Sequence, residues 1–145
     1  MQFMDDGVQK LMRAMDDERT PVETMSPQDA RAAIAGRRVA VTNLEDVATA
    51  GDRTIPGPGG EVRVRIYRPH GDSGSRPAVV FAHGGGFVLC DLDSHDGFCR
   101  SMSRFTDTVV VSVDYRLAPE HRAPAAVEDV FATWCWFLDR AEELG

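Results

Sequence analysis

A histidine and three consecutive glycines, His83 to Gly86, follow directly after the apolar run PAVVFA. Glycine is entropically costly to order, so a chain that places three of them beside a strand needs bare backbone at that point. Such backbone can approach a ligand closely and direct several N–H groups at one spot. This arrangement would serve phosphate binding or the stabilisation of an oxyanion, and a glycine-rich turn without a ligand is the third interpretation.

The residues around the glycines favour an oxyanion over a phosphate. Phosphate loops follow the patterns GxGxxG or GxxxxGKS/T and lead directly into a helix. The stretch HGGGFVLCDLDS matches neither pattern and contains no Lys or Arg. An oxyanion hole requires two or more amides aimed at developing negative charge, and a run of glycines after a strand can provide them.

Other reactive residues in the sequence form no complete site. GDSGS at 71–75 resembles the GxSxG motif of a serine nucleophile, but it ends in Ser75 and is followed by Arg76 and Pro77 where a helix should begin. Ser73 is therefore expected to be a turn residue. The polar run DSHD at 93–96 lacks the spacing of metal ligands, so neither a metal nor another cofactor is predicted.

Composition and charge restrict the function further. The 145 residues are 43% hydrophobic and 27% charged, as in one globular domain, and the net charge of −7 argues against binding to nucleic acid or an anionic membrane. No apolar run approaches the roughly 20 residues that span a bilayer, and the first residues lack the pattern of a secretory signal. Cys90, Cys99 and Cys135 lack CxxC spacing, so we expect reduced thiols in a cytoplasmic protein.

The first half of the chain carries clear signals for two helices and a hairpin. Apolar residues at helical spacing predict a helix over 8–18, and Ser26 followed by Pro27 predicts the start of a second. The turn IPGPGG at 55–60 precedes the alternating run VRVRIY. Together they predict a β-hairpin within 47–69.

Two strands and two helices complete the pattern. The runs at 77–82 and 108–115 lack the alternation of polar and apolar residues, as expected of strands covered on both faces, and helices are predicted over 94–106 and 124–144. Strand, helix, strand and helix in this order predict a right-handed parallel unit and therefore an α/β fold. In the last helix, six apolar residues follow the 3.6-residue period: Val127, Val130, Phe131, Trp134, Phe137 and Leu138.

The motifs HGGGF, DLDSHD and DYRLAPEH, the last followed by PAAVEDV, together resemble the hormone-sensitive-lipase-like branch of the α/β-hydrolase esterases. The resemblance covers nearly the whole chain but only about the first half of such a protein. It implies the N-terminal part of an α/β-hydrolase sheet, with a leading hairpin, the parallel strand–helix–strand–helix unit and two leading cap helices. Residues 1–40 would hold the cap helices, and 41–145 would form the first half of the hydrolase domain.

Roles for individual residues follow from the same resemblance. The amides of Gly85 and Gly86 would form part of the oxyanion hole, with Gly84 allowing the turn and His83 supporting it. His83 is not expected to be the general base, because in these enzymes the serine, acid and histidine all follow the glycine loop. Support of the loops at this edge of the sheet is implied for four further residues: Asp93, Ser94, Asp114 and Tyr115.

The catalytic triad is expected outside residues 1–145. In this family the nucleophile elbow, often GDSAGG, follows one further strand after the region that this chain resembles. Strand 77–82 would then be an exposed parallel edge, open to self-association or to pairing with a C-terminal half. The resemblance implies a small, fairly apolar acyl ester as the substrate and no cofactor.

Two alternatives to a partial esterase stay open at this point. The fold also serves as a small-molecule receptor in the plant gibberellin receptor, so a non-catalytic binding module is one of them. The other is a partner-dependent fragment that completes its sheet with a second polypeptide.

Cys90 departs from the family pattern, which usually has Gly at this position. If the position requires a positive φ, a cysteine there would be strained. Alternatively the backbone has adjusted and Cys90 is a small buried apolar group, which is the arrangement we expect.

Overall fold

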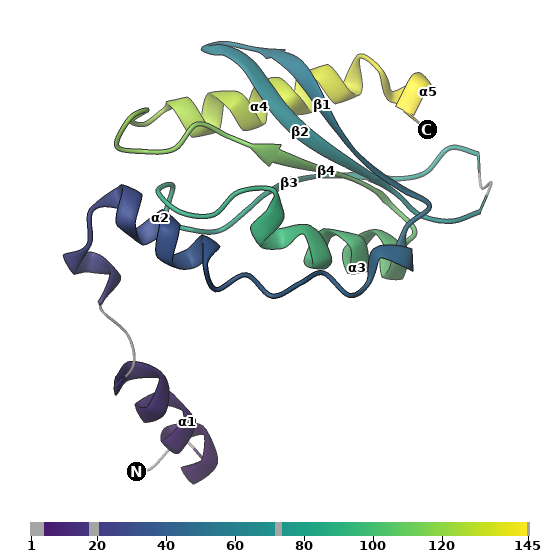
Figure 1. Cartoon of the computed structure of the whole chain (residues 1–145). Helices are drawn as coiled ribbons and strands as arrows, with labels where there is room; N and C mark the ends of the chain where they lie inside the picture. The colour runs from purple at the N-terminus through teal and green to yellow at the C-terminus, as the bar shows by residue number, and fades with distance from the viewer. Residues whose placement is uncertain (1–4, 18–20, 72–73, 145) are drawn as a thin grey trace.

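The computed structural model describes residues 5–17, 21–71 and 74–144, and its centre is a four-stranded mixed sheet (Figure 1). The strand order is β1-β2-β4-β3. The hairpin strands β1 and β2 pair antiparallel, β2 pairs antiparallel with β4, and β3 and β4 are parallel. The strands span Thr49–Gly57 (β1), Gly60–Arg68 (β2), Ala78–Ala82 (β3) and Val109–Asp114 (β4).

Helices α3 and α4 lie on opposite faces of this sheet, and α1 lies away from it (Figure 1). This arrangement confirms the predicted α/β class and the predicted strand–helix–strand–helix unit. The α-helices span Asp6–Asp17 (α1), Pro27–Ala35 (α2), Asp96–Thr106 (α3), Ala125–Leu138 (α4) and Ala141–Leu144 (α5). Short 3₁₀ turns span Val22–Thr24, Leu44–Asp46 and Asp93–His95.

Local sequence signals set the ends of several elements. Helix α2 begins where Ser26 predicted it, because the Ser26 hydroxyl accepts a hydrogen bond from the Asp29 amide (3.2 Å). The hairpin turns between Gly57 and Gly60, and Gly60 has a φ of +123°, which favours glycine. Helix α3 ends at Thr106, and the next residue, Asp107, has a left-handed φ of +51°.

The core lies on both faces of β4, whose residues from Val109 to Val113 are all buried. Alternate residues of β2 and β4 pack with Ala126 and Phe137 of α4 on one face. On the other face Val110 packs with Tyr67, Cys99 and Val47. The continuous apolar run of β4 is thus explained by helices on both sides of the sheet.

The apolar residues of α4 do not all face the sheet. Of the six that follow the helical period, only Phe137 is buried and Val130 half-buried, while the other four are between 44% and 65% exposed. The buried face of α4 instead includes two polar residues, Asp129 and Thr133. The described part of the sheet therefore covers only part of the apolar surface of α4.

Asp96, at the start of α3, is a buried anchor between α3 and the hairpin. Its carboxylate accepts hydrogen bonds from the Tyr67 hydroxyl (2.8 Å), Arg100 Nε (2.7 Å) and Arg65 Nη1 (3.1 Å). Burial alone would raise the pKa of Asp96, but the bonds from Arg100, Tyr67 and Arg65 hold it below the usual 3.8. Asp96 belongs to the polar run 93–96 of the sequence, yet it is buried in the structure.

We expect Asp96→Asn to lower the free energy of unfolding by about 3 kcal/mol, because it removes the buried charge that pairs with Arg100 and weakens the hydrogen bonds from Tyr67 and Arg65. Since the pKa of Asp96 is lower in the folded state than the unperturbed 3.8, its stabilising effect is present at neutral pH and is lost as the pH falls through the folded-state value. Urea unfolding at pH 7 and at decreasing pH would measure both effects. The control is Asp93→Asn, which removes an exposed carboxylate and should cost no more than about 1 kcal/mol.

Candidate active site

The glycine loop, residues 83–90, follows the carboxyl end of β3 and folds back on itself. Gly85 has a φ of +129° and Gly86 a φ of +61°. The Gly85 carbonyl accepts hydrogen bonds from the amides of Val88 (3.1 Å) and Leu89 (2.9 Å). A Cβ atom at Gly85 would lie 2.2 Å from the Leu89 carbonyl oxygen, so only glycine fits this turn.

The amides of the three glycines differ from those of Val88 and Leu89 in having no acceptor within the described residues. Within the described parts of the chain, no hydrogen bond is donated by the amide of Gly84, Gly85 or Gly86. Gly84 and Gly86 are exposed and Gly85 is half-buried, so water or a ligand can reach the loop. Unpaired N–H groups on a fixed turn are the structural requirement for oxyanion stabilisation.

The side chain of His83 supports the glycine loop and is only 4% exposed. Its Nδ1–H donates to the Gly84 carbonyl (2.8 Å), and its ring stacks on Tyr115 with centroids 4.3 Å apart. The Tyr115 hydroxyl donates to the His83 carbonyl (2.6 Å). Both residues therefore lie where the sequence predicted support of the loop. The other ring nitrogen of His83, Nε2, is buried and has no hydrogen-bond partner among the described residues.

A buried ion pair holds the second loop of the site, which follows β4. Asp129 of α4 is fully buried and accepts hydrogen bonds from the Arg116 amide (2.9 Å) and from two nitrogens of its guanidinium (2.9 Å each). The amide of Ala118 then donates to the Phe87 carbonyl (2.8 Å). This bond joins the second loop to the glycine loop.

Arg31 of α2 binds both loops at once. Its Nε donates to the Val88 carbonyl and its Nη2 to the Ala118 carbonyl, both at 2.7 Å. The same guanidinium forms a bidentate ion pair with Glu120 (2.9 and 2.8 Å), and this hydrogen bonding holds the pKa of Glu120 at about 2. The second predicted cap helix thus contacts the glycine loop directly through one side chain.

Comparison with known proteins identifies the fold that positions these loops. A family model described as the alpha/beta hydrolase fold matches residues 79–145. The solved structure of a hyperthermophilic esterase from Pyrobaculum calidifontis superposes on 99% of this chain with a TM-score of 0.84 and 38% sequence identity. The chain has an α/β-hydrolase fold. Its resemblance to the hormone-sensitive-lipase-like esterases is confirmed.

Relatives of this chain are named as ester hydrolases, and each is much longer. The carboxylic ester hydrolase LipN of Mycobacterium tuberculosis is 54% identical over 92 residues, which are 63% of this chain and 24% of LipN. The metagenomic carboxylesterase EstE1 is 43% identical with a TM-score of 0.71, and the match covers 83% of this chain and 41% of EstE1. The chain spans less than half of each, and 46% of the Pyrobaculum esterase.

Three other predicted support residues lie near the loops but make different contacts. Asp93 is exposed and pairs with Arg65 (3.0 Å), and Ser94 forms a local turn in which its amide donates to Asp91 (3.0 Å). Asp114 was expected to bond within the loops. Its carboxylate instead binds Arg63 (2.8 Å), because the two residues are directly opposite each other on β4 and β2.

The remaining candidates supply no catalytic group to this site. Ser73 lies outside the described residues, and the flanking Gly71 and Gly74 have φ values of +88° and +65°. In the part of the chain that the structure describes, no three His, Cys, Asp or Glu side chains are grouped as metal ligands. No helix among these residues has the length and hydropathy needed to cross a bilayer.

The expectation for Cys90 was wrong. Its φ is +70°, so the backbone has kept the left-handed conformation that favours the glycine usual in the family. Cys90 is half-buried rather than part of the core. Gly85, Gly86, Phe87 and Cys90 all have positive φ values, so Cys90 is one of several residues in this loop with the backbone conformation that favours glycine.

Sequence reasoning missed Arg31 and Asp129 as residues that fix the site. Asp129 lies within the motif PAAVEDV, and an acidic residue on the inner face of an apolar helix could have indicated a buried ion pair. Arg31 has no comparable signal, because its acceptors lie 57 and 87 residues away along the chain.

Alanine substitutions at Gly85 and Gly84 test whether the turn requires glycine at Gly85 for steric reasons. We expect Gly85→Ala to lower the free energy of unfolding by at least about 2 kcal/mol, since the new Cβ would overlap the Leu89 carbonyl at a positive φ. Gly84→Ala is the matched control, because nothing lies within 4 Å of its added Cβ and its φ is not positive. Urea unfolding of both variants measures the difference, and equal stability would contradict this account of the turn.

We expect Cys90→Gly to raise the free energy of unfolding by about 0.5–1 kcal/mol. Glycine removes the steric penalty of the left-handed conformation, and the greater freedom of the unfolded chain offsets only part of this gain. Cys90→Ala keeps the Cβ atom and should give no gain. A glycine variant no more stable than the alanine variant would show that Cys90 is not strained.

Proposed function

We propose that this chain contributes the oxyanion-binding part of a serine carboxylesterase. The observation that carries the proposal is the set of free amides at Gly84, Gly85 and Gly86, held on a turn that admits no side chain at Gly85. The names of the relatives, which are esterases and carboxylic ester hydrolases, support the same reaction class.

In the proposed reaction a serine hydroxyl attacks the carbonyl carbon of an acyl ester. A bond forms between the serine oxygen and the acyl carbon, the hydroxyl proton passes to a histidine base, and the carbonyl oxygen becomes an oxyanion. The amides of Gly85 and Gly86 donate hydrogen bonds to that oxyanion. The tetrahedral intermediate then expels the alcohol, which takes the proton from the histidine.

We infer that the serine, its histidine and the acid lie in polypeptide outside residues 1–145. Support comes from the position of the glycine loop, which precedes all three groups in hydrolases of this kind. The burial of His83 supports this too, because its side chain is only 4% exposed and its ring stacks on Tyr115. Small acyl esters are the substrates we propose, from the resemblance alone.

Hydrolysis of p-nitrophenyl butyrate tests the proposal. We expect purified 1–145 and its Ser73→Ala variant to show no turnover above background. We expect turnover from a chimera that joins 1–145 to the part of LipN C-terminal to the segment that this chain matches. Activity of 1–145 that disappears in Ser73→Ala would make Ser73 the nucleophile, and a folded but inactive chimera would reject the esterase function.

A further inference from the structure

We propose that His95 makes the glycine loop sensitive to pH. The neutral ring of His95 supports the loop from the start of α3, and uptake of a proton by this ring in mild acid weakens the support and opens the loop. The proposal concerns the conformation of the loop itself. Only its consequence for ester hydrolysis rests on the proposed function, because an opened loop no longer holds the amides of Gly85 and Gly86 in place.

A row of stacked rings connects His95 to the glycine loop. The ring of His95 stacks on that of His83, with centroids 5.8 Å apart and 23° between the ring planes. His83 stacks in turn on Tyr115, with centroids 4.3 Å apart. His83 Nδ1 donates to the Gly84 carbonyl, and the Tyr115 hydroxyl donates to the His83 carbonyl. His95 therefore packs against the residues that hold the start of the loop.

The surroundings of His95 accommodate a neutral ring better than a charged one. His95 is half-buried, its ring contacts that of Phe81 in β3 with centroids 5.7 Å apart, and its Nδ1 is buried without a hydrogen-bond partner among the described residues. A charged imidazole carries a proton on both nitrogens. Its Nδ1–H would be a buried donor without an acceptor, which is costly. In the neutral ring the proton can lie on Nε2 instead.

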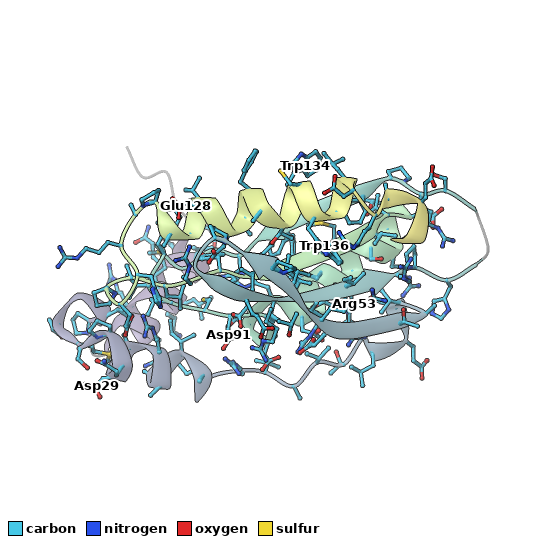
Figure 2. All side chains as sticks on the ribbon, turned by 90° about the horizontal axis from the view of Figure 1, so that it is seen from above. Asp29, Arg53, Asp91, Glu128, Trp134 and Trp136 are labelled. Carbon is cyan, nitrogen blue, oxygen red and sulfur yellow. The ribbon has the colours of Figure 1, made fainter. Side chains whose placement is uncertain are left out.

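The charged groups around His95 add to this preference, and Asp91 opposes it. His95 is the N-cap residue of α3, where the helix dipole disfavours a cation. Arg37 and Arg38 line the same groove of about 520 Å³ as His95. Asp91, labelled in Figure 2, favours a charge on His95. Its carboxylate, however, already pairs with Arg38 and accepts hydrogen bonds from the amide and hydroxyl of Ser94 (3.0 and 2.8 Å).

The other titratable groups near His95 offer no free anion. Asp93 pairs with Arg65 (3.0 Å). The carboxylate of Asp96 is occupied by its three buried hydrogen bonds. Cys90 lines the same groove as His95, and a thiol carries no charge in mild acid. A proton on His95 would therefore place a poorly compensated charge beside the glycine loop.

The pKa of His95 links proton uptake to opening of the loop. Burial, followed by the neighbouring His83, lowers this pKa below the usual 6.5, and Asp91 has a smaller, opposite effect. In the window between the lowered value and 6.5, an opened or unfolded state binds more protons than the closed state. The stability that the neutral ring contributes is therefore complete above pH 6.5 and is lost as the pH falls through this window.

Backbone strain favours opening once the support is weakened. Phe87 and Cys90 have φ values of +63° and +70°, which side-chain-bearing residues keep only where their surroundings impose them. The amides of Val88 and Leu89 close the turn by donating to the Gly85 carbonyl (3.1 and 2.9 Å). Loss of these two hydrogen bonds is the local signal of an opened loop.

Hydrogen exchange of 1–145, measured by NMR without substrate, tests the pH switch. The protection factors of the Val88 and Leu89 amides are compared at pH 7 and pH 5, each corrected for the intrinsic exchange rate. We expect protection to fall by about threefold or more at pH 5. In His95→Phe, which keeps an aromatic ring without a titrating nitrogen, protection should be equal at both pH values. His70→Gln is the matched control and should keep the wild-type dependence, because His70 is exposed and follows β2 at the opposite end of the sheet.

Titration of the unmodified chain gives a measurement that depends on no variant. The ring protons of His95 should titrate with a midpoint below 6.5 that coincides with the midpoint of the loss of protection at Val88 and Leu89. The amide of Val111, in the buried strand β4, reports global unfolding, and its protection should change less. Equal loop protection at pH 7 and pH 5 would overturn the proposal. So would a pH dependence that persists in His95→Phe, or a His95 midpoint at or above 6.5.

The esterase function and the pH switch can fail separately. Hydrogen exchange needs no catalysis, so a folded but inactive chimera of 1–145 and LipN would reject the esterase function and leave the switch intact. In an active chimera, His95→Phe should retain at pH 5 a larger share of its pH 7 kcat than the parent chimera retains. Both proteins share the same catalytic histidine, so an equal share would overturn the role of the switch in catalysis.

Discussion

Parallel pairing of β3 with β4 is the constraint on which the site depends. In this register Ala82 is opposite Val113, so both strands end at the same edge of the sheet. His83 and Tyr115 follow those ends and stack on each other. The glycine loop and the loop after β4 are thereby brought together although about 30 residues of chain separate them. No local feature of either loop could produce this contact.

Glycine loops need external support, because residues without side chains cannot pack to hold their own conformation. This loop receives support from three separate elements. Tyr115 binds it from the end of β4, Ala118 from the following loop, and Arg31 from α2. All three use backbone carbonyls of the glycine loop as acceptors, and the amides of Gly84, Gly85 and Gly86 donate no hydrogen bond within the described residues. The polar contacts that fix the loop therefore do not compete with the groups that could bind an oxyanion.

Sequence patterns predicted the elements well because those elements depend on periodicity and turn chemistry. The hairpin, both parallel strands and the helix predicted at 94–106, observed as α3 from Asp96, follow from apolar spacing and from Gly and Pro in the turns. The helix predicted over 124–144 is instead two helices, α4 (Ala125–Leu138) and α5 (Ala141–Leu144). The individual contacts were harder to predict. Asp114 binds Arg63 because of the strand register, and Asp96 is buried because Tyr67 and two arginines surround it. Such partners are distant in sequence and leave no local pattern.

Cys90 is a position where the residue type led to a wrong prediction of the backbone conformation. Its residue type suggested that the backbone had adjusted, yet the surrounding turn imposes a positive φ on it. Backbone conformation in a tight loop is determined jointly by its neighbours, such as Gly85 against Leu89, rather than by the preference of one residue.

Helix α4 connects the candidate site to the rest of the surface. Its inner face holds Asp129, which fixes Arg116 and with it the loop after β4. Its outer face holds Phe131 and Trp134, only two and five residues further along. The same helix thus fixes the loop after β4 with a buried carboxylate and exposes large apolar side chains on its other face.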